Sequence, residues 1–425
     1  MRVDIFCESG EKYGLGHLRR CENLLLHLQE VFPTIKFQSS FHSSFCYPDY
    51  ELEVVIVDSY IAPLSFYENL RCQVLICLDD YFRLPYPHNA LILRPTLGAK
   101  TFSKSYGGED YVILNPVFTQ KKITPTQKNK ILINLGGSNQ NNLIKQILKS
   151  IHGDIHILNP YFKHPKAHHS LNPQEICSLI DSSEIVICAG GGGLNEALSR
   201  GKKIIALCIA NNQRSQLQNA HFLPSLFTIF SRTNLSSKLS CALNALVSMS
   251  SPSPKPLGLR LRPWLYKTFL PILSAKNAKH FCLLSHKQKL EVLSIRNQEE
   301  VRANSLNSAP IGIKEHLRFI ANLSFSQFFW AFFEDERKKG EIIAVGSLSL
   351  KEGNKATLGI YKNLRYKHIG EKILHSLIDS ARKLNINTIE LEVLQTNTRA
   401  ICLYEKFGFA KIQENQKFLT MEKNL

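Results

Sequence analysis

The sequence lacks the features of disulfide-rich proteins, of proteins with structural zinc sites and of membrane-spanning proteins. None of its 11 cysteines forms a Cys-x-x-Cys pair, and most lie inside apolar runs, as Cys77 and Cys188 do. This usage is typical of buried, reduced thiols and disfavours a disulfide framework. No apolar run reaches the ~18 residues of a membrane span, and the opening MRVDIFCESG lacks the basic start and long apolar region of a signal peptide. We therefore expect a cytoplasmic protein with no membrane partner.

Acidic residues are scarce compared with basic ones. Asp and Glu number 35 against 52 Lys and Arg, which gives a formal net charge of +17. Such a chain can bind polyanions, or it can simply carry a basic solvated surface. No arginine-rich run, RNA-binding signature or zinc-finger spacing is present, so we expect no nucleic-acid partner.

The pattern of apolar runs predicts an α/β protein with more than one domain. The 425 residues are 44% hydrophobic, enough for two to four domains at roughly 100–200 residues each. Continuously apolar strands alternate with helical patterns, which is typical of parallel sheets covered on both faces. We expect Rossmann-like domains at 1–122 and 128–272, separated by the polar segment KKITPTQKNK. Their predicted strands are 2–8, 54–58, 74–80, 91–93, 112–114, 130–135, 154–158, 184–189 and 203–209.

A stretch rich in Ser and Pro, 248–263, marks the second expected boundary, unless it is a long surface loop. Beyond it, residues 283–425 form a mixed α+β domain. Segments 325–334 and 341–351 flank DERKKG and predict an antiparallel hairpin. Further strands are expected at 356–361 and 388–394, with helices at 370–384 and 397–407.

Glycine turns follow several predicted strands, at the sheet edge where open α/β folds bind ligands. The run YGLGHLRR places Gly14 and Gly16 before a helix that begins near His17. Glycines allow a ligand to approach the backbone, and a helix start offers free amides. The alternative for this segment alone is a plain strand–helix turn with a surface histidine.

The second predicted domain carries three comparable turns. The run AGGGGLNE predicts a phosphate-binding helix start. Glu196 either accepts hydrogen bonds from a ribose or compensates the charge of the helix start. The candidate nucleotide-binding residues of these turns are Gly137, Ser138, Gly191, Gly192, Gly193, Glu196, Asn212 and Gln213.

These motifs, taken together over about 1–270, resemble the UDP-sugar hydrolases of pseudaminic acid biosynthesis, within the two-domain GT-B-type group. The matching runs are YGLGHLRR, VDSY, LDD, ILINLGGSN, AGGGGLNEAL and ANNQ. The resemblance implies hydrolysis of UDP-2,4-diacetamido-2,4,6-trideoxy-β-L-altrose with no metal, and it makes His17 the base that activates water. Histidine suits that role because its pKa lies near neutrality.

Charged residues near these turns are further candidates. Arg20 could pair with phosphate, although Arg19 or Arg20 should face solvent. Asp58, Tyr60 and Asp80 follow predicted strands and could meet sugar hydroxyls or acetamido groups, or they could serve as caps and turn residues. The histidines in KHPKAHHS are expected to be a solvated loop, not a metal site.

The C-terminal region resembles the GNAT acyl-CoA N-acetyltransferases, over about 283–425. The matching runs are SIRN, KEHLRFI, LGIYKNLRYKHIGEKIL and IELEVLQTN with the helix after it. The resemblance implies acetyl-CoA as co-substrate and Tyr404 as the acid that protonates the leaving thiolate. Its candidate acetyl-CoA residues are Ile360, Tyr361, Arg365, His368, Gly370 and Asn397. His368 stands at the first glycine of the pyrophosphate motif, which a side chain can occupy if φ is negative.

The two resemblances together predict a bifunctional enzyme that acetylates a UDP-4-amino-sugar and then hydrolyses the product. Two alternatives stay open. One is a GT-B glycosyltransferase fused to an acetyltransferase, in which an acceptor hydroxyl replaces water. The other is a non-catalytic sugar-nucleotide sensor or scaffold, for instance with an inactive GNAT-like fold.

Overall fold

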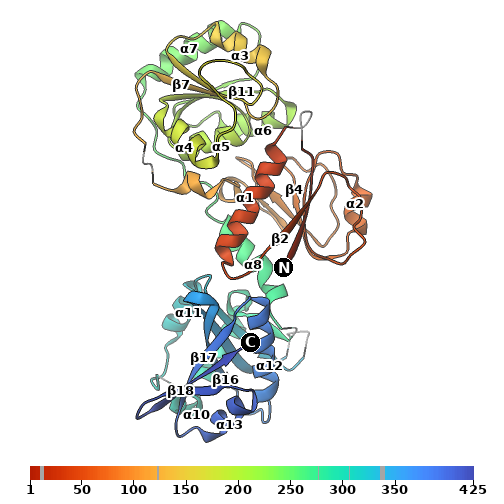
Figure 1. The fold of residues 1–425 in the computed structure, drawn as a ribbon, viewed down its shortest axis with the longest axis vertical. Helices are drawn as coiled ribbons and strands as arrows, with labels where there is room; N and C mark the ends of the chain where they lie inside the picture. The colour runs from red at the N-terminus through yellow and green to blue at the C-terminus, as the bar shows by residue number, and fades with distance from the viewer. Residues whose placement is uncertain (10–13, 122–123, 276, 306, 336–339) are drawn as a thin grey trace. The chain divides into compact units, whose positions relative to one another are not determined.

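The structure is a computed structural model that describes residues 1–9, 14–121, 124–275, 277–305, 307–335 and 340–425. Its contacts divide the chain into two compact units. One unit comprises Arg2–Leu28 and Gln38–Arg262, and the other comprises Met1, Gln29–Phe37 and Pro263–Leu425. Figure 1 shows the elements of each unit.

The first sheet is parallel throughout, with strand order β2-β1-β3-β4-β5-β6. β3 and β4 are almost fully buried apolar strands, as expected for central strands covered on both faces. Its elements are β1 (Arg2–Cys7), α1 (Gly16–Val31), β2 (Gln38–His42), β3 (Leu52–Asp58), α2 (Leu64–Asn69), β4 (Cys72–Leu78), β5 (Ala90–Arg94) and β6 (Ser105–Gly107), followed by the short helices η1 (Glu109–Tyr111) and η2 (Pro116–Thr119).

The second sheet is also parallel, with order β12-β11-β10-β7-β8-β9. Alternate residues of β7 and β10 join two separate cores, one shared with α3 and α7 and the other with α4 and α5, so these helices cover opposite faces (Figure 1). The elements are β7 (Lys130–Asn134), α3 (Asn141–Leu148), β8 (Asp154–Leu158), β9 (Ala167–His168), α4 (Pro173–Ser182), β10 (Ile185–Ala189), α5 (Gly192–Ser199), β11 (Lys203–Leu207), η3 (Asn211–Gln213), α6 (Arg214–Ala220), β12 (Leu226–Ile229) and α7 (Leu235–Ser248).

The third sheet is mixed, with order β13-β14-β15-β16-β17-β19-β18 and one parallel pair, β16 with β17. Its elements are β13 (Ala278–His280), η4 (Phe281–Leu283), α9 (His286–Arg296), α10 (Glu299–Ala303), α11 (Ile313–Ala321), β14 (Gln327–Phe333), β15 (Ile342–Lys351), η5 (Glu352–Asn354), β16 (Lys355–Lys362), α12 (Gly370–Lys383), β17 (Thr388–Leu394), α13 (Thr398–Lys406), β18 (Ala410–Glu414) and β19 (Phe418–Asn424). The helix α8 (Leu261–Leu273) precedes it.

The predicted succession of two parallel sheets and a mixed sheet is confirmed. The hairpin is confirmed as β14 and β15, which pair antiparallel; residues 336–339 of its turn lie outside the described residues. The strand predicted at 112–114 is wrong, because this segment leaves the sheet between η1 and η2. Its apolar side chains, Val112 and Leu114, instead pack in the core of the second sheet.

The Ser/Pro-rich stretch is held by backbone hydrogen bonds. Lys255 N–H donates to Leu198 O, Gly258 N–H to Glu109 O and Arg260 N–H to Asp110 O. The two compact units divide at the end of this stretch, between Arg262 and Pro263. The boundaries expected near 122–128 and 272–283 stay predictions, as does the linker at 121–130, of which residues 122 and 123 lie outside the described residues.

None of the described helices combines the length and apolar character needed to cross a membrane.

Candidate active sites

His17 lies in the first turn of α1, directly after the glycine turn. Gly14 has a φ of +75°, a conformation that favours glycine, and α1 begins at Gly16; Tyr13 of the YGLG run lies outside the described residues. The His17 side chain is buried, at 8% exposure. A plain turn with a surface histidine is therefore excluded.

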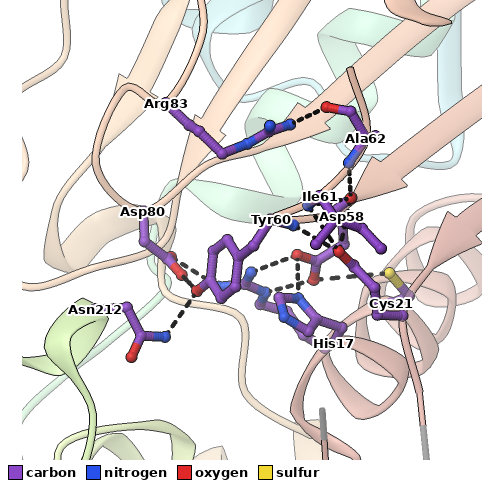
Figure 2. A network of polar contacts seen from close by, with 12 residues as sticks. His17, Cys21, Asp58, Tyr60, Ile61, Ala62, Asp80, Arg83 and Asn212 are labelled. Carbon is purple, nitrogen blue, oxygen red and sulfur yellow. Dashed lines mark hydrogen bonds and ion pairs between the residues drawn. The ribbon is translucent and has the colours of Figure 1, made fainter. Parts of the chain in front are cut away.

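The imidazole of His17 is held by Asp58, the last residue of β3. His17 Nδ1 lies 2.6 Å from Asp58 Oδ1 (Figure 2). Because an ionised carboxylate only accepts hydrogen bonds, the shared proton belongs to Nδ1. The Nε2 atom of neutral His17 is thereby left as an acceptor, the form that a general base needs.

Asp58 does not occupy the position expected of a sugar ligand. Its side chain is fully buried, and both carboxylate oxygens are engaged. Besides His17, Asp58 accepts from Arg20 Nη2 at 2.5 Å and from Arg20 Nε at 2.7 Å. The predicted contact of Asp58 with substrate is therefore corrected to a contact with His17 and Arg20.

Arg20 is likewise engaged by the protein. Residues 17 and 20 are three apart on α1 and share one helix face, which turns the guanidinium toward the strand ends. Besides Asp58, Arg20 reaches Asp80 Oδ1 through Nη1 at 2.7 Å. Arg19 faces outward with 62% of its side chain exposed and pairs with Glu22. Of the two arginines, Arg19 is the one that faces solvent.

Tyr60 connects this cluster to the second sheet. Its hydroxyl donates to Asp80 Oδ2 and accepts from Asn212 Nδ2 at 3.1 Å, so Asn212 in the η3 turn reaches a residue of the first sheet (Figure 2). The Tyr60 ring also packs edge-on against His17, with ring centroids 4.5 Å apart. The predicted residues His17, Arg20, Asp58, Tyr60, Asp80 and Asn212 thus form one contact network.

The charges of the network set its protonation. Burial favours the neutral form of Asp58, but the charges of Arg20 and His17 and their hydrogen bonds outweigh burial and lower its pKa to about 2. Burial also lowers the pKa of His17, yet the charge and hydrogen bond of Asp58 outweigh it, and the net pKa of His17 is raised. Burial and Asp80 raise the pKa of Tyr60. Asp58 is therefore an anion and Tyr60 a neutral phenol at neutral pH.

The glycine turns of the two sheets lie close together. A Cβ added to Gly14 would lie 4.0 Å from Ser138, and one added to Gly137 would lie 3.5 Å from Leu15. The predicted residues Gly14, Gly16, Gly137 and Ser138 thus come from turns that face each other within one compact unit.

The four-glycine run has two different parts. A Cβ at Gly190 would lie 2.7 Å from Leu217, and one at Gly193 would lie 2.9 Å from Asn134 Nδ2, so these positions are tight. A Cβ at Gly191 or Gly192 would meet no atom of the described residues within 4 Å. Since α5 begins at Gly192, the open positions coincide with the helix start, where free amides favour an anion.

Two predicted nucleotide residues differ in surroundings. Glu196 is half-buried on α5, and burial alone raises its pKa to about 7; within the described residues its carboxylate has no hydrogen-bond partner. Gln213 instead accepts a hydrogen bond from Ile209 N–H at 3.1 Å and braces its own turn. Among the described residues, neither side chain is hydrogen-bonded to His17, Arg20, Asp58, Tyr60 or Asp80.

Sequence reasoning missed Glu8, which follows β1 and is 3% exposed. Its Oε1 accepts hydrogen bonds from Ser59 Oγ and from the amides of Tyr60 and Ile61. Glu8 therefore shapes the loop that carries Tyr60. Its position after a strand, like that of Asp58 and Asp80, is the signal that could have found it.

In the third sheet the parallel strands β16 and β17 pair only at their start. Their ladder runs from Lys355↔Thr388 to Thr357↔Glu390, whereas β16 pairs with β15 up to Lys362. Ile360 and Tyr361 thus lie on β16 beyond the point where its ladder with β17 ends. This divergence leaves the β17 side of their backbone without a strand partner.

The turn between β16 and α12 carries the predicted pyrophosphate residues. Arg365 is 75% exposed and lies 3.6 Å from Glu341, and Gly370 begins α12. His368 is exposed and has a φ of +56°. The condition under which a side chain is expected to fit at His368, a negative φ, is therefore not met: the backbone takes the left-handed form for which the motif has glycine.

Asn397 and Tyr404 lie on the helix after β17. The Asn397 side chain caps α13 by accepting a hydrogen bond from Ala400 N–H at 3.2 Å. Tyr404 is 9% exposed, and burial raises its pKa to about 12. Tyr404 is therefore protonated at neutral pH and able to donate a proton.

An aromatic cavity of about 230 Å³ was not foreseen from the sequence. Arg296, at the end of α9, contributes an Nη1 atom that is buried and has no hydrogen-bond partner among the described residues. The cavity is lined by Phe281, Arg296, Ile311, Glu315, His316, Phe319, Phe329 and Tyr361. Tyr361, predicted as an acetyl-CoA residue, contributes its side chain to this wall.

Across the described residues, no group of three or more His, Cys, Asp and Glu side chains is arranged to hold a metal ion. The His168 side chain of KHPKAHHS lies 3.1 Å from His156.

Comparisons with known proteins find similarity to an acetyltransferase family and to two curated proteins. Residues 299–409 match the acetyltransferase (GNAT) family. The chain is 32% identical over 259 residues to the pseudaminic acid cytidylyltransferase and UDP-2,4-diacetamido-2,4,6-trideoxy-beta-L-altropyranose hydrolase of Helicobacter pylori, which covers 55% of this chain and 49% of that protein. The chain thus spans about half the length of this relative. Because 55% exceeds the share of the predicted acetyltransferase region, the match extends into the parallel sheets.

A second relative is the acetyltransferase PseH of Campylobacter jejuni, 26% identical over 143 residues, or 33% of this chain and 88% of that protein. The crystal structure of the Campylobacter jejuni N-acetyltransferase PseH matches at 22% identity with a TM-score of 0.29, covering 35% of this chain and 96% of that one. Residues 299–409 thus form a domain that matches the acetyltransferase (GNAT) family, and the chain is also similar to the Helicobacter pylori protein named as a cytidylyltransferase and UDP-sugar hydrolase.

Proposed function

We propose that the chain is a bifunctional nucleotide-sugar enzyme of pseudaminic acid biosynthesis. Its GNAT domain would acetylate the amino nitrogen on C4 of UDP-4-amino-4,6-dideoxy-N-acetyl-β-L-altrosamine with acetyl-CoA. Its N-terminal region, with the two Rossmann-like domains in a GT-B-type arrangement, would hydrolyse UDP-2,4-diacetamido-2,4,6-trideoxy-β-L-altrose to UDP and the free sugar.

The observation that carries the hydrolase proposal is the His17–Asp58 pair. A buried histidine with Nδ1 bound to an anion offers Nε2 as a base. It lies at the carboxyl ends of parallel strands, where open α/β folds bind ligands. The raised pKa of His17 strengthens Nε2 as a base.

In the proposed hydrolysis His17 Nε2 takes one proton from a water molecule as the water oxygen bonds to C1 of the sugar. The bond between C1 and the diphosphate oxygen breaks, and its electron pair leaves with UDP. Amides at the start of α5, near Gly191 and Gly192, would stabilise the charge on the diphosphate. His17 then returns its proton to solvent.

Roles for the other residues follow from their surroundings. Tyr60, after β3, and Asn212, in the η3 turn, would both contact the sugar nucleotide, since their side chains are hydrogen-bonded to each other. Glu196 would accept hydrogen bonds from the ribose, because burial leaves its carboxyl without a partner among the described residues.

For acetyl transfer, the 4-amino nitrogen attacks the carbonyl carbon of the acetyl-CoA thioester. The C–S bond then breaks, and its electron pair stays on sulfur. Tyr404 would protonate the thiolate, which a phenol of raised pKa can do at neutral pH. The amine proton passes to solvent, and the Tyr404 phenolate takes a proton back from solvent. The free side of β16 at Ile360 and Tyr361 would hold the acetyl-CoA arm.

The aromatic cavity is the proposed acceptor pocket. Four aromatic rings, from Phe281, Phe319, Phe329 and Tyr361, offer apolar walls, and the free Nη1 of Arg296 offers a buried donor. This combination suits a planar base or acetamido group with a carbonyl oxygen.

The test is mass spectrometry of the purified chain with acetyl-CoA and the 4-amino UDP-sugar. The proposal expects acetylated UDP-sugar first, then UDP and free sugar with no acceptor present. Tethering of the two sites would favour passage of the intermediate between them. UDP release that needs an added acceptor would indicate a glycosyltransferase, and binding without turnover would indicate a sensor.

A further inference from the structure

Arg20 occupies a central place in the His17 network. Its guanidinium spans two carboxylates from neighbouring strands, Asp58 at the end of β3 and Asp80 after β4. Three of its donor nitrogens are engaged at 2.5–2.7 Å, and only 18% of its side chain is exposed. An Arg with these partners is poorly placed to bind a diphosphate, because the phosphate would compete with two anions already in contact.

The two carboxylates each hold a different residue of the proposed site. Asp58 binds His17 Nδ1, and Asp80 accepts from the Tyr60 hydroxyl. The orientation of both carboxylates depends on a planar fork of donors, which an ammonium group cannot reproduce. Without it, the partners left to the fully buried Asp58 anion among the described residues would be His17, whose protonation can change, and the Cys21 thiol at 4.0 Å.

We propose that Arg20 is a positioning residue: it fixes Asp58 so that His17 keeps its proton on Nδ1 and its free acceptor at Nε2, and it fixes Asp80 against Tyr60. This inference rests on the proposed hydrolase function, and it replaces the phosphate contact expected for Arg20.

The titratable and charged groups that face His17 come from each element packed around it. Asp58 and Glu8 raise the pKa of His17 by their negative charge, whereas Arg20 lowers it. Among the described residues, the groups that interact with His17 are Cys7 of β1, Glu8 after it, Arg20 of α1, Asp58 of β3 and Tyr60 after it. Loss of Arg20 should therefore raise the pKa of His17 and allow its proton to lie on either ring nitrogen.

The chain offers a matched control in the adjacent arginine. Arg20→Met removes the fork, Arg20→Lys keeps a cation but not the fork, and Arg19→Met removes an equal charge that is 62% exposed. Two-bond ¹⁵N NMR of the full unliganded chain, with the His17 signals assigned through His17→Gln, reports the tautomer and titration of His17. Calorimetry with UDP reports phosphate binding.

We expect wild type and Arg19→Met to show the Nδ1–H tautomer with one shared titration midpoint. Arg20→Met should raise the titration midpoint of His17 and give a mixture of its Nδ1–H and Nε2–H tautomers. Arg20→Lys should bring the midpoint close to the wild-type value but should leave the tautomers mixed. UDP affinity should change less than about threefold. If Arg20→Met fails to fold, the tautomer of His17 in Arg20→Lys alone decides whether Arg20 is a positioning residue.

An unchanged tautomer and midpoint in Arg20→Lys and Arg20→Met would overturn the proposal. UDP binding weakened more than about tenfold, with His17 unchanged, would make Arg20 a phosphate ligand instead. The tautomer needs no turnover, so these outcomes decide the role of Arg20 even if wild type releases no UDP and the hydrolase proposal fails.

Discussion

His17 Nδ1 and Asp58 Oδ1 lie 2.6 Å apart, although 41 residues separate them in the chain. The pair joins the first turn of a helix to the last residue of a buried strand. Asp58 has no exposed surface, so its charge acts on its protein neighbours and not on solvent. The first predictions concern this pair.

Replacing His17 with Ala should lower UDP release by about 10²-fold to 10⁴-fold, the usual contribution of a general base. Acetyl transfer should be unchanged, because Tyr404 and the acetyl-CoA residues belong to the other compact unit. Both products can be followed in one reaction by mass spectrometry. Hydrolysis that survives the substitution would refute the mechanism.

The pH dependence of hydrolysis should report the titration of His17. The base must be neutral, and the pKa of His17 is raised above 6.5, so kcat/KM should fall as pH decreases through a midpoint above 6.5. Asp58→Asn removes the anion that raises this pKa, and should move the midpoint to lower pH while reducing the plateau. Glu22→Gln, on the outer face of α1, is the control that should leave the profile in place. A midpoint that stays fixed in Asp58→Asn would contradict the pairing.

Substitutions at different glycines of the AGGGG run should affect stability and substrate binding separately. Gly190→Ala forces a methyl group against the buried Leu217 side chain, and overpacking of this kind costs about 1–3 kcal/mol of unfolding free energy. Gly191→Ala meets no atom of the described residues within 4 Å and should leave stability unchanged while raising the KM for the UDP-sugar. Denaturant titration and steady-state kinetics measure the two effects. Equal losses of stability in both variants would be inconsistent with the packing described.

His368→Gly should stabilise the GNAT domain by about 0.5–1 kcal/mol, because the φ of +56° penalises a side chain and not glycine. Lys367→Gly is the control, since Lys367 is exposed and has no positive φ; it should be neutral or slightly destabilising. Thermal or denaturant unfolding compares the two. A loss of stability in His368→Gly would show that the His368 side chain makes a stabilising contact.

Tyr404→Phe should lower the rate of acetyl transfer by about 10-fold to 10²-fold, the low end of general acid catalysis. The substitution removes only a hydroxyl, so packing against Phe409 is retained. Tyr366→Phe, which loses an exposed contact with Glu341, should leave the rate unchanged. The release of CoA from acetyl-CoA, followed with a thiol reagent, provides the assay. Equal rates in wild type and Tyr404→Phe would remove Tyr404 from the mechanism.

The sequence by itself determined the order of the sheets, and it predicted candidate ligand sites at the ends of their strands. Buried parallel strands read as apolar runs, and Asp58 and Asp80 stand where such runs end. Residues 17 and 20 are three apart on one helix and share a face, so the spacing indicates that Arg20, and not Arg19, faces the sheet together with His17. These are local properties, set by the period of helix and strand.

Only the tertiary structure decided which of these residues meet. Asp58 changed from an expected sugar contact to the partner of His17 and Arg20 because β3, β4 and α1 converge once the parallel strands are in register. The Asn212–Tyr60 contact and the aromatic cavity depend in the same way on segments far apart in the chain. The left-handed backbone of His368 was likewise hidden, because residue type sets only a preference for φ, and the surrounding turn selects its value.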